Sequence, residues 1–157
     1  MKSRDNRTFL EFFGGVTIIV SLIFLGYELK RSNDIAEAEA TATVYQASNE
    51  YLLTYIVDQN LRHVWRKSLE DGSESLTDDE QRLVTATLTY IYNIHEIAWQ
   101  FHQKGLMSDA DMATRYFELC LGINKYPDVA KDWANRRDLV LSGFYDDVSR
   151  ECKIANE

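Results

Sequence analysis

Residues 9–29, FLEFFGGVTIIVSLIFLGYEL, are the stretch of sequence on which the fold depends. The uncharged part, Phe12 to Tyr27, has 16 residues and as a helix would measure about 24 Å. The full stretch of 21 residues would measure about 31 Å, close to the roughly 30 Å hydrocarbon core of a bilayer. Glu11 and Glu28 would lie near opposite interfaces, where a carboxylate reaches headgroups or water. The stretch therefore predicts a membrane-spanning helix.

Two other interpretations of this stretch are a signal peptide and a buried helix of a soluble protein. A signal peptide has a basic start, an apolar centre and a small-residue cleavage site. Residues 2–7 supply the basic start and residues 36–38 (AEA) imitate the cleavage site, but Lys30 and Arg31 separate that site from the apolar centre. A buried helix would explain why the uncharged run is shorter than an ideal span. We favour the spanning helix over both.

One face of this helix carries small or polar residues at recurring positions, Gly14, Thr17, Ser21 and Glu28. Small residues let transmembrane backbones approach each other, and hydroxyl groups hydrogen-bond across helices. Beyond the predicted span the same face becomes mostly apolar and continues at heptad spacing as Ile35, Ala38, Ala42, Tyr45, Asn49, Leu52 and Ile56. A seven-residue apolar repeat favours a left-handed supercoil, and a polar residue in its core can fix the register.

These features predict one continuous helix over about residues 8–58 that packs against copies of itself or against a partner helix. The candidate helix–helix interface consists of Gly14, Thr17, Ser21, Glu28 and Asn49. The alternative is that the soluble half of the helix packs on its own domain and that the polar face has no partner. A short heptad run that includes alanine and asparagine does not decide between the two.

The 157-residue chain has a net charge of −8, and the acidic excess lies beyond the apolar stretch. Residues 1–31 contain five Lys/Arg and three Asp/Glu, so residues 32–157 contain 12 and 22, a net charge of −10. An acidic domain repels phosphate backbones, which argues against nucleic-acid binding. One proline and seven glycines argue against disorder and against an all-β fold.

Cys120 and Cys152 are the only cysteines, and two cysteines make neither a disulfide framework nor a structural zinc site. Cys120 lies in an apolar pattern with helical spacing, so we expect a small buried core residue there. The charges beside the apolar stretch do not fix its orientation, because three basic residues precede it and two follow it.

The sequence predicts a series of helices for the rest of the chain. Residues 60–70 form a short helix with Leu61, Val64, Trp65 and Leu69 on one side, and residues 71–76 (DGSESL) form a loop. Thr77 and Glu80 make a capping box that opens a helix running to about Lys104, and Gly105 ends it.

Three further helices are expected after Gly105. Ser108 caps a helix over residues 112–121 that ends near Gly122, and Pro127 starts a helix over residues 127–138. Ser142 caps the last helix. No segment has the two-residue alternation of a strand. The fold class is therefore all-α, with a long transmembrane helix in an anchor at residues 1–31 that continues into a small helical bundle at residues 32–157.

Several short segments of the sequence, taken together, match the pattern of a known family. They are Glu11 with its glycine pair, IVSLIFLGYELKRSN at residues 19–33, NLRHVWRKSLED at residues 60–71, the Gly105 junction, and Trp133 followed by Arg137 and Phe144. This pattern resembles a widespread family of small, uncharacterised bacterial proteins that are membrane-anchored helical proteins with one span. The resemblance implies an inner-membrane anchor and a cytoplasmic domain, but no reaction. Relatives carry extra arginines after the span, where this chain has Asp34, Glu37 and Glu39, so its orientation stays open.

No residue constellation predicts catalysis or metal binding. His95, Trp99 and His102 share a helix face, but the two histidines stand about 10.5 Å apart along the axis and cannot bind one ion together. We expect a structural role for both. A nucleophile elbow, a catalytic cysteine signature and a glycine-rich phosphate loop are all missing. We therefore predict no catalytic residue, no metal, no cofactor and no enzyme.

Arg115, Arg136 and Arg137, together with Trp133, form a candidate site for an anionic ligand. A guanidinium group binds anions with two parallel hydrogen bonds, and an indole ring supplies a stacking surface. The alternative is that these arginines pair with the abundant aspartates and glutamates.

Two functional hypotheses follow. The first is an oligomeric accessory or scaffold subunit, a single-pass protein of the bacterial inner membrane with a cytoplasmic domain. Its partners are the lipid bilayer and either copies of itself or another membrane protein. The second is a ligand-gated effector or sensor whose helical domain binds a small anionic ligand and whose polar transmembrane face lines a pore or changes its packing.

Overall fold

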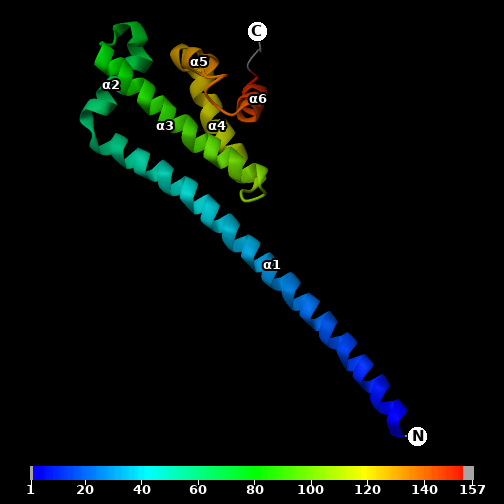
Figure 1. Cartoon of the computed structure of the whole chain (residues 1–157). Coiled ribbons are helices and arrows are strands. Elements are labelled where there is room, and N and C mark those ends of the chain that lie inside the picture. The colour runs from blue at the N-terminus through cyan, green and yellow to red at the C-terminus, as the bar shows by residue number, and fades with distance from the viewer. Residues whose placement is uncertain (1, 154–157) are drawn as a thin grey trace. The chain divides into compact units, whose positions relative to one another are not determined.

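The computed structural model describes the backbone of residues 2–153 and the side chains from residue 14 onward. Within those residues all regular structure is helical and no strand occurs, which confirms the all-α prediction (Figure 1). The chain divides into two compact units, residues 1–38 and residues 39–157. The predicted boundary between residues 31 and 32 concerns where the membrane would end, so this division does not test it.

The elements, in chain order, are α1 (Lys2–Val57), α2 (Gln59–Asp71), the short 3-10 helix η1 (Ser73–Ser75), α3 (Asp78–Gln103), α4 (Asp109–Lys125), α5 (Pro127–Ala134) and α6 (Ser142–Glu151). The helix expected over residues 8–58 corresponds to α1. Asp58 ends it and caps α2, because its carboxylate accepts a hydrogen bond from the Leu61 amide at 3.0 Å. The guanidinium of Arg62 donates to the carbonyls of Tyr55 and Ile56 at the end of α1.

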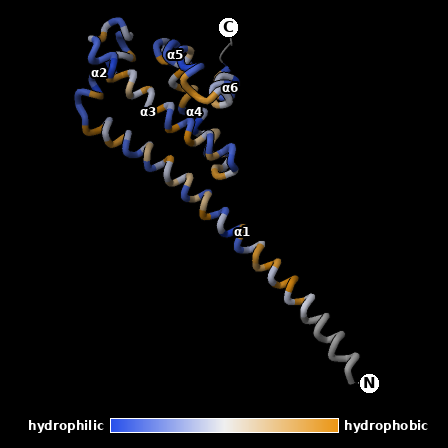
Figure 2. The backbone as a smooth tube through the Cα atoms, viewed as in Figure 1, coloured by the Kyte–Doolittle hydropathy of each residue, from blue (hydrophilic) through white to orange (hydrophobic). Residues whose placement is uncertain are grey.

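In the first unit, the apolar side chains of residues 16–29 are exposed around the whole helix, from 42% at Val16 to 68% at Ile23. Figure 2 shows this run as the hydrophobic part of α1. Judged on residues 14–153, no helix combines the length and the apolar character that crossing a bilayer requires. Residues 9–13 of the predicted span lie outside the described side chains.

In the second unit, the last part of α1 packs against α3 and α4 through one face. Ala40 and Val44 are buried, and Val44 belongs to a small core cluster with Ile94, Ala98, Met107 and Met112. The Tyr90 hydroxyl of α3 donates to the Ala47 carbonyl of α1 at 3.2 Å. The predicted alternative, in which this part of the helix packs on its own domain, therefore applies to the face that contains Val44.

A larger core lies between α3, α4, α5 and α6 around Trp133. The Trp133 ring stacks on Tyr145 with centroids 5.2 Å apart, and it meets Tyr92 and Phe144 edge-on. Such aromatic contacts add stabilisation beyond the burial of apolar area. The core also contains Leu88, Leu119, Ile123, Val129, Val148 and Cys152.

Three expected helix starts, at Thr77, Ser108 and Pro127, are present, and the one expected from a cap at Ser142 is not. Thr77 and Glu80 make the predicted capping box of α3, and Ser108 caps α4 through a hydrogen bond from the Asp111 amide at 3.2 Å. Ser142 is not a cap, because it is the first residue of α6 itself. The amide of Leu141, the residue before it, instead donates to Glu96 Oε1 of α3 at 2.7 Å.

Two expected helix ends are wrong. α4 continues through Gly122 to Lys125, because Gly122 does not take the left-handed conformation that ends a helix. Gly105, where φ is +68°, does take that conformation just after α3. α5 ends at Ala134 rather than at residue 138, and the chain turns through residues 135–141 before α6.

Cys120 is half-buried and packs against the larger core, and it has a covalent partner that was not predicted from the sequence. Cys120 of α4 forms a disulfide with Cys152, the residue that follows α6, and their Cα atoms are 5.0 Å apart. The bond joins positions separated by 32 residues, which helical spacing does not indicate. It fastens the end of α6 to the middle of α4.

Candidate functional site

A cavity of about 530 Å³ lies in the second unit between the last part of α1 and helices α2 to α5. Its volume falls within the range of small-molecule sites. Most of its wall is apolar or aromatic, and a few polar side chains converge on one side. Its lining residues include Ser48, Asn49, Trp65, His95, Arg115 and Glu118.

Arg115 of α4 is the central polar residue of this wall, and only 5% of its surface is exposed. Its guanidinium lies 4.8 Å from the centre of the Tyr45 ring of α1. Its Nη1 donates to Ser48 Oγ and to Glu118 Oε2, each at 3.2 Å. Those hydrogen bonds both come from Nη1, whereas a guanidinium has five N–H donors on three nitrogens.

His95 of α3 lies beside this pair and is also buried. Its Nδ1 is 2.8 Å from the Ile91 carbonyl, so Nδ1 carries a hydrogen and donates to that oxygen. Its Nε2 has no hydrogen-bond partner among the described residues and lies 3.6 Å from Glu118 Oε2. His95, followed by Arg115, lowers the pKa of Glu118, so this carboxyl is ionised at neutral pH.

Tyrosines form much of the rest of the wall. Tyr51 of α1 packs against Tyr90 of α3 with ring centroids 5.8 Å apart, and burial, followed by the neighbouring Tyr55, raises the pKa of Tyr51 to about 12. Its hydroxyl is therefore neutral at physiological pH. Neutral phenols beside apolar side chains favour binding of a ligand with an apolar body over chemistry on it.

The Ser48 hydroxyl is the only serine or threonine hydroxyl among the residues that line the cavity. Nothing in the cavity pairs a nucleophile with a base, because the Ser48 hydroxyl is hydrogen-bonded to Arg115 and to the Val44 carbonyl. In residues 14–153 no three His, Cys, Asp or Glu side chains come together as metal ligands.

The candidate anionic site predicted from the sequence is distributed over two places. Arg115 lines the cavity, whereas Arg136 is buried on the other side of Tyr92 and lies 4.8 Å from the centre of that ring. Arg136 pairs with Asp132 and donates to Thr89, each at 2.8 Å. Trp133 is buried against Tyr92, and Arg137 is exposed. Arg136 and Trp133 therefore share Tyr92, and neither they nor Arg137 line the cavity.

Sequence reasoning missed Ser48, His95 and Glu118 as neighbours of Arg115. The spacing of Arg115 and Glu118, three residues apart on one helix, is a signal that could have paired them. Ser48 is 67 residues from Arg115, and no local pattern connects these two positions.

The two histidines for which a structural role is expected lie in different environments. His102 Nε2 lies 2.8 Å from Asp109 Oδ1 and joins the end of α3 to the start of α4, while His95 belongs to the cavity. Trp99, which shares their face, donates from its indole nitrogen to Asp147 of α6 at 2.8 Å. The roles of His102 and Trp99 are structural contacts between helices.

The predicted helix–helix interface is exposed along most of its length. In the first unit Gly14, Thr17 and Ser21 are exposed and Glu28 is half-buried, and Ser21 donates its hydroxyl hydrogen to the Thr17 carbonyl at 2.8 Å. In the second unit Asn49, Leu52 and Ile56 are exposed as well. The described residues of the second unit cover the Val44 face of α1, whereas the heptad face is exposed, although its Tyr45, Asn49 and Leu52 also line one side of the cavity.

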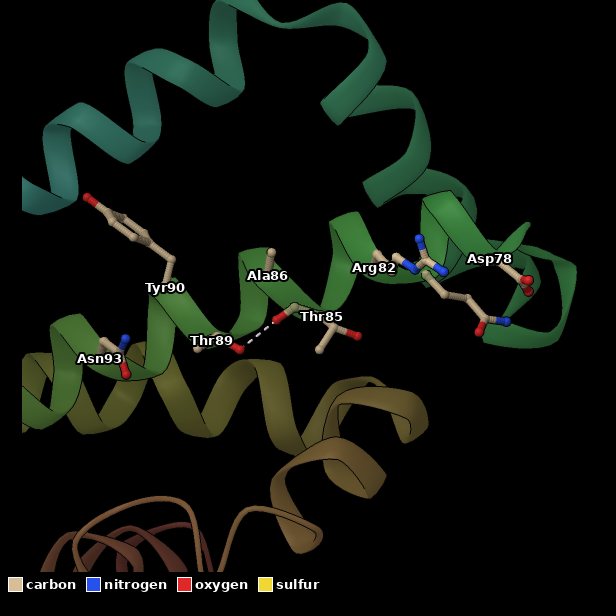
Figure 3. Close-up of a pocket in the computed structure, with 8 residues that line it drawn as sticks. Asp78, Arg82, Thr85, Ala86, Thr89, Tyr90 and Asn93 are labelled. Carbon is tan, nitrogen blue, oxygen red and sulfur yellow. Dashed lines mark hydrogen bonds between the residues drawn. The ribbon is translucent and has the colours of Figure 1, made fainter.

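A second depression runs along an outer face of α3 (Figure 3). All of its lining residues come from this one helix, from Asp78 to Asn93, and among the labelled side chains Tyr90 points toward α1, where its hydroxyl donates to the Ala47 carbonyl. Thr89 donates to the Thr85 carbonyl within the helix at 2.8 Å. Because one helix forms the whole wall, this surface cannot enclose a ligand as the cavity at Arg115 can.

Comparison with known proteins found no matching family model, no matching curated protein and no matching solved structure.

Proposed function

We propose that this chain is a single-span protein of the bacterial inner membrane and acts as an oligomeric accessory or scaffold subunit without catalytic activity. The observation that carries the proposal is the run of apolar side chains at residues 16–29, which is exposed on every side of α1. Water-exposed apolar surface of this extent is unfavourable, and lipid removes it from water. Residues 9–13 extend the run in sequence to the length of a bilayer. We also propose that the chain is related to the small bacterial membrane-anchored proteins that it resembles.

A second part of the proposal is self-association through the heptad face of α1. The exposed Leu52 and Ile56 and the polar Asn49 recur at heptad spacing, and the domain's own core uses a different face. In the membrane, Gly14, Thr17 and Ser21 supply the small side chains that permit close approach of a second copy.

The disulfide supports placing the domain in an oxidising compartment, outside the cytoplasm. Such bonds persist in the periplasm and at cell surfaces, whereas cytosolic reductants keep thiols reduced. In this orientation three basic residues, at positions 2, 4 and 7, face the cytoplasm and two, Lys30 and Arg31, face the other side, a distribution that does not oppose the positive-inside rule. This orientation replaces the cytoplasmic domain that the family resemblance implies, and the disulfide is the reason.

Anchoring and orientation are tested on native membranes. We expect the full-length protein to stay with membranes after an alkaline carbonate wash. When cells are lysed in an alkylating agent, neither cysteine should react until a reductant is added. Recovery of the protein from the soluble fraction without detergent would contradict the anchor, and direct alkylation of both cysteines would contradict the orientation.

Self-association is tested by crosslinking Ser21→Cys in membranes. The two native cysteines are bonded to each other, so the introduced thiol is the free one. We expect a covalent dimer from Ser21→Cys and little from the matched control Ile23→Cys, which lies about 200° around the helix. Equal yields from the two variants, or no dimer from either, would refute an interface on this face.

A ligand-responsive effector is the second candidate function, and the cavity at Arg115 is the observation that favours it. Residues of α1 form one wall of this cavity and α3 and α4 form the others, so an occupant would contact all three helices. A ligand that binds one packing of these helices more tightly than another would shift the population toward that packing.

A further inference from the structure

The polar side of the cavity is built around incompletely used hydrogen-bond donors. The hydrogen bonds that Arg115 makes to described residues both leave from Nη1, although the side chain is almost fully buried. Buried guanidinium groups normally have their donors satisfied. Nε2 of His95, on the same wall, has no hydrogen-bond partner among the described residues. Arg115 therefore has bonding capacity at the cavity wall that described residues do not fill, whereas Nε2 of His95 is covered and lies beside Glu118.

We propose that this cavity binds a small monocarboxylate with an apolar or aromatic body, and that the carboxylate is held by Arg115. This inference rests on the second candidate function, ligand binding by the helical domain. A carboxylate accepts two parallel hydrogen bonds from a guanidinium fork, which uses donors that a single Nη1 contact leaves over.

The charges of the cavity limit the ligand to one negative charge. Among its lining residues, Arg115 is the only arginine or lysine, and Glu118 already balances that charge. A ligand carboxylate bound to the remaining donors of Arg115 shares this one cation with Glu118. Phosphate and dicarboxylates bring further negative charge toward Glu118, which repels it.

The remaining wall defines the body of the ligand. Leu52, Leu69, Leu88, Ile91 and Leu119 line it together with the rings of Tyr51, Trp65 and Tyr126. An alkyl chain or a single aromatic ring removes this surface from water, whereas a sugar or a peptide amide would leave its own polar groups without partners.

The chain contains a natural reporter for this site. Trp65 lines the cavity, Trp133 is buried in the aromatic core, and Trp99 is hydrogen-bonded to Asp147. A ligand in the cavity should change the emission of Trp65, and Trp65→Phe should remove that change.

The test is isothermal titration of the full-length protein in lipid nanodiscs with 4-phenylbutyrate and with octanoate, which separate an aromatic acid from a lipid-derived one. The neutral amide of each acid and inorganic phosphate are the comparisons. We expect at least one acid to bind, with its amide weaker by about tenfold or more. Equal binding of acid and amide, tighter binding of phosphate, or no binding of either acid at millimolar concentration would overturn the proposal.

Variants locate the binding. Arg115→Gln combined with Glu118→Gln removes both charges together, so that no unpaired buried charge remains. We expect this double variant to weaken acid binding about tenfold or more. Arg137→Gln, which removes an exposed arginine outside the cavity, is the control and should leave acid binding unchanged. Gly122→Leu places a side chain in the cavity wall without touching any charge and should also weaken binding. Unchanged affinity in a folded double variant would overturn the proposal.

Failure of this inference can be told apart from failure of the proposed function. Membrane retention and the Ser21→Cys crosslink are measured on the same protein without ligand. If these hold and no acid binds, the ligand proposal alone is wrong.

Discussion

At Gly143 the backbone of α6 lies directly against the indole ring of Trp99. A Cβ atom on Gly143 would be 3.0 Å from both Cζ2 and Cη2 of that ring, closer than carbon atoms normally pack. The ring is not free to withdraw, because its nitrogen donates to Asp147 one turn later in α6. Glycine is needed here for space, since φ at Gly143 is not positive.

Gly143→Ala should therefore lower the free energy of unfolding by about 1–3 kcal/mol through overpacking. Urea denaturation of the full-length protein in detergent, followed by circular dichroism, measures the change. The matched control is Gly122→Ala, where the added Cβ meets only Val129 at 3.9 Å and alanine favours the helix by up to about 1 kcal/mol. A loss of stability in both variants would show that the contact with Trp99 is not the cause.

The ionisation of Glu80 is tied to the capping box at the start of α3. Its Oε2 accepts from the Thr77 amide at 2.8 Å and from Lys67 Nζ at 2.9 Å. The backbone hydrogen bond from Thr77, followed by the bond from Lys67, lowers the pKa of Glu80 from 4.5 to about 2. A lowered pKa in the folded state means that the ionised carboxylate stabilises the fold above pH 4.5 and that this contribution is lost as the pH falls from 4.5 through 2.

Glu80→Gln should consequently lower the melting temperature at pH 7, and the difference from the wild type should shrink below pH 4.5 and vanish near pH 2. Thermal unfolding curves recorded at several pH values give this difference directly. Glu74→Gln, which removes an exposed carboxylate of η1, serves as the charge control. A pH-independent difference between wild type and Glu80→Gln would rule out the ionised capping box as its source.

At the scale of the element, two faces of α1 in the second unit differ in their exposure to solvent. Val44, which is 1% exposed, packs against α3 and α4, whereas Leu52 on the heptad face is 51% exposed. Burial in the folded domain and the self-association proposed above therefore involve different residues of the same helix. Substitutions can separate the two.

Val44→Ala should lower the free energy of unfolding by about 1–3 kcal/mol, because it removes two buried methyl groups and leaves a cavity. Leu52→Ala should change the free energy of unfolding by less than about 0.5 kcal/mol and should weaken self-association. Urea denaturation gives the first quantity, and the crosslinking yield of Ser21→Cys gives the second. The reverse assignment, with Leu52→Ala the more destabilising, would mean that the heptad face packs on the domain.

Helix ends could be predicted from the sequence where the signal is local and not where it is distant. The Thr77–Glu80 capping box and the Ser108 cap need only neighbouring residues, and both are present. At the start of α6, Glu96 accepts a hydrogen bond from the Leu141 amide, which lies 45 residues away in the sequence. The cap predicted from the sequence at Ser142 was wrong. Composition likewise identified the arginines, but it could not tell that Arg136 is paired with Asp132 while Arg115 faces the cavity.

At the scale of the whole molecule, the disulfide is the covalent constraint on the second unit. The bond between Cys120 and Cys152 closes a loop of 32 residues that contains the end of α4, all of α5 and α6. Closing a loop of this length restricts the unfolded chain and stabilises the fold by roughly 3–4 kcal/mol in the chain-entropy model.

Reduction should accordingly lower the melting temperature of the full-length protein, and Cys120→Ser combined with Cys152→Ser should lower it to a similar extent. Calorimetry with and without a phosphine reductant measures both effects. The reductant should leave the double variant unchanged. An equal effect of the reductant on wild type and on the double variant would show that it acts elsewhere than on this bond.

The same bond determines what happens when the backbone is cut between α5 and α6. Residues 135–141 lie inside the loop that the disulfide closes, and Leu139 among them is 75% exposed, so a protease can reach this segment. A cleaved chain would still be held as one covalent molecule through sulfur. It would run at full length on a denaturing gel and separate into two fragments only after the sample is treated with a thiol.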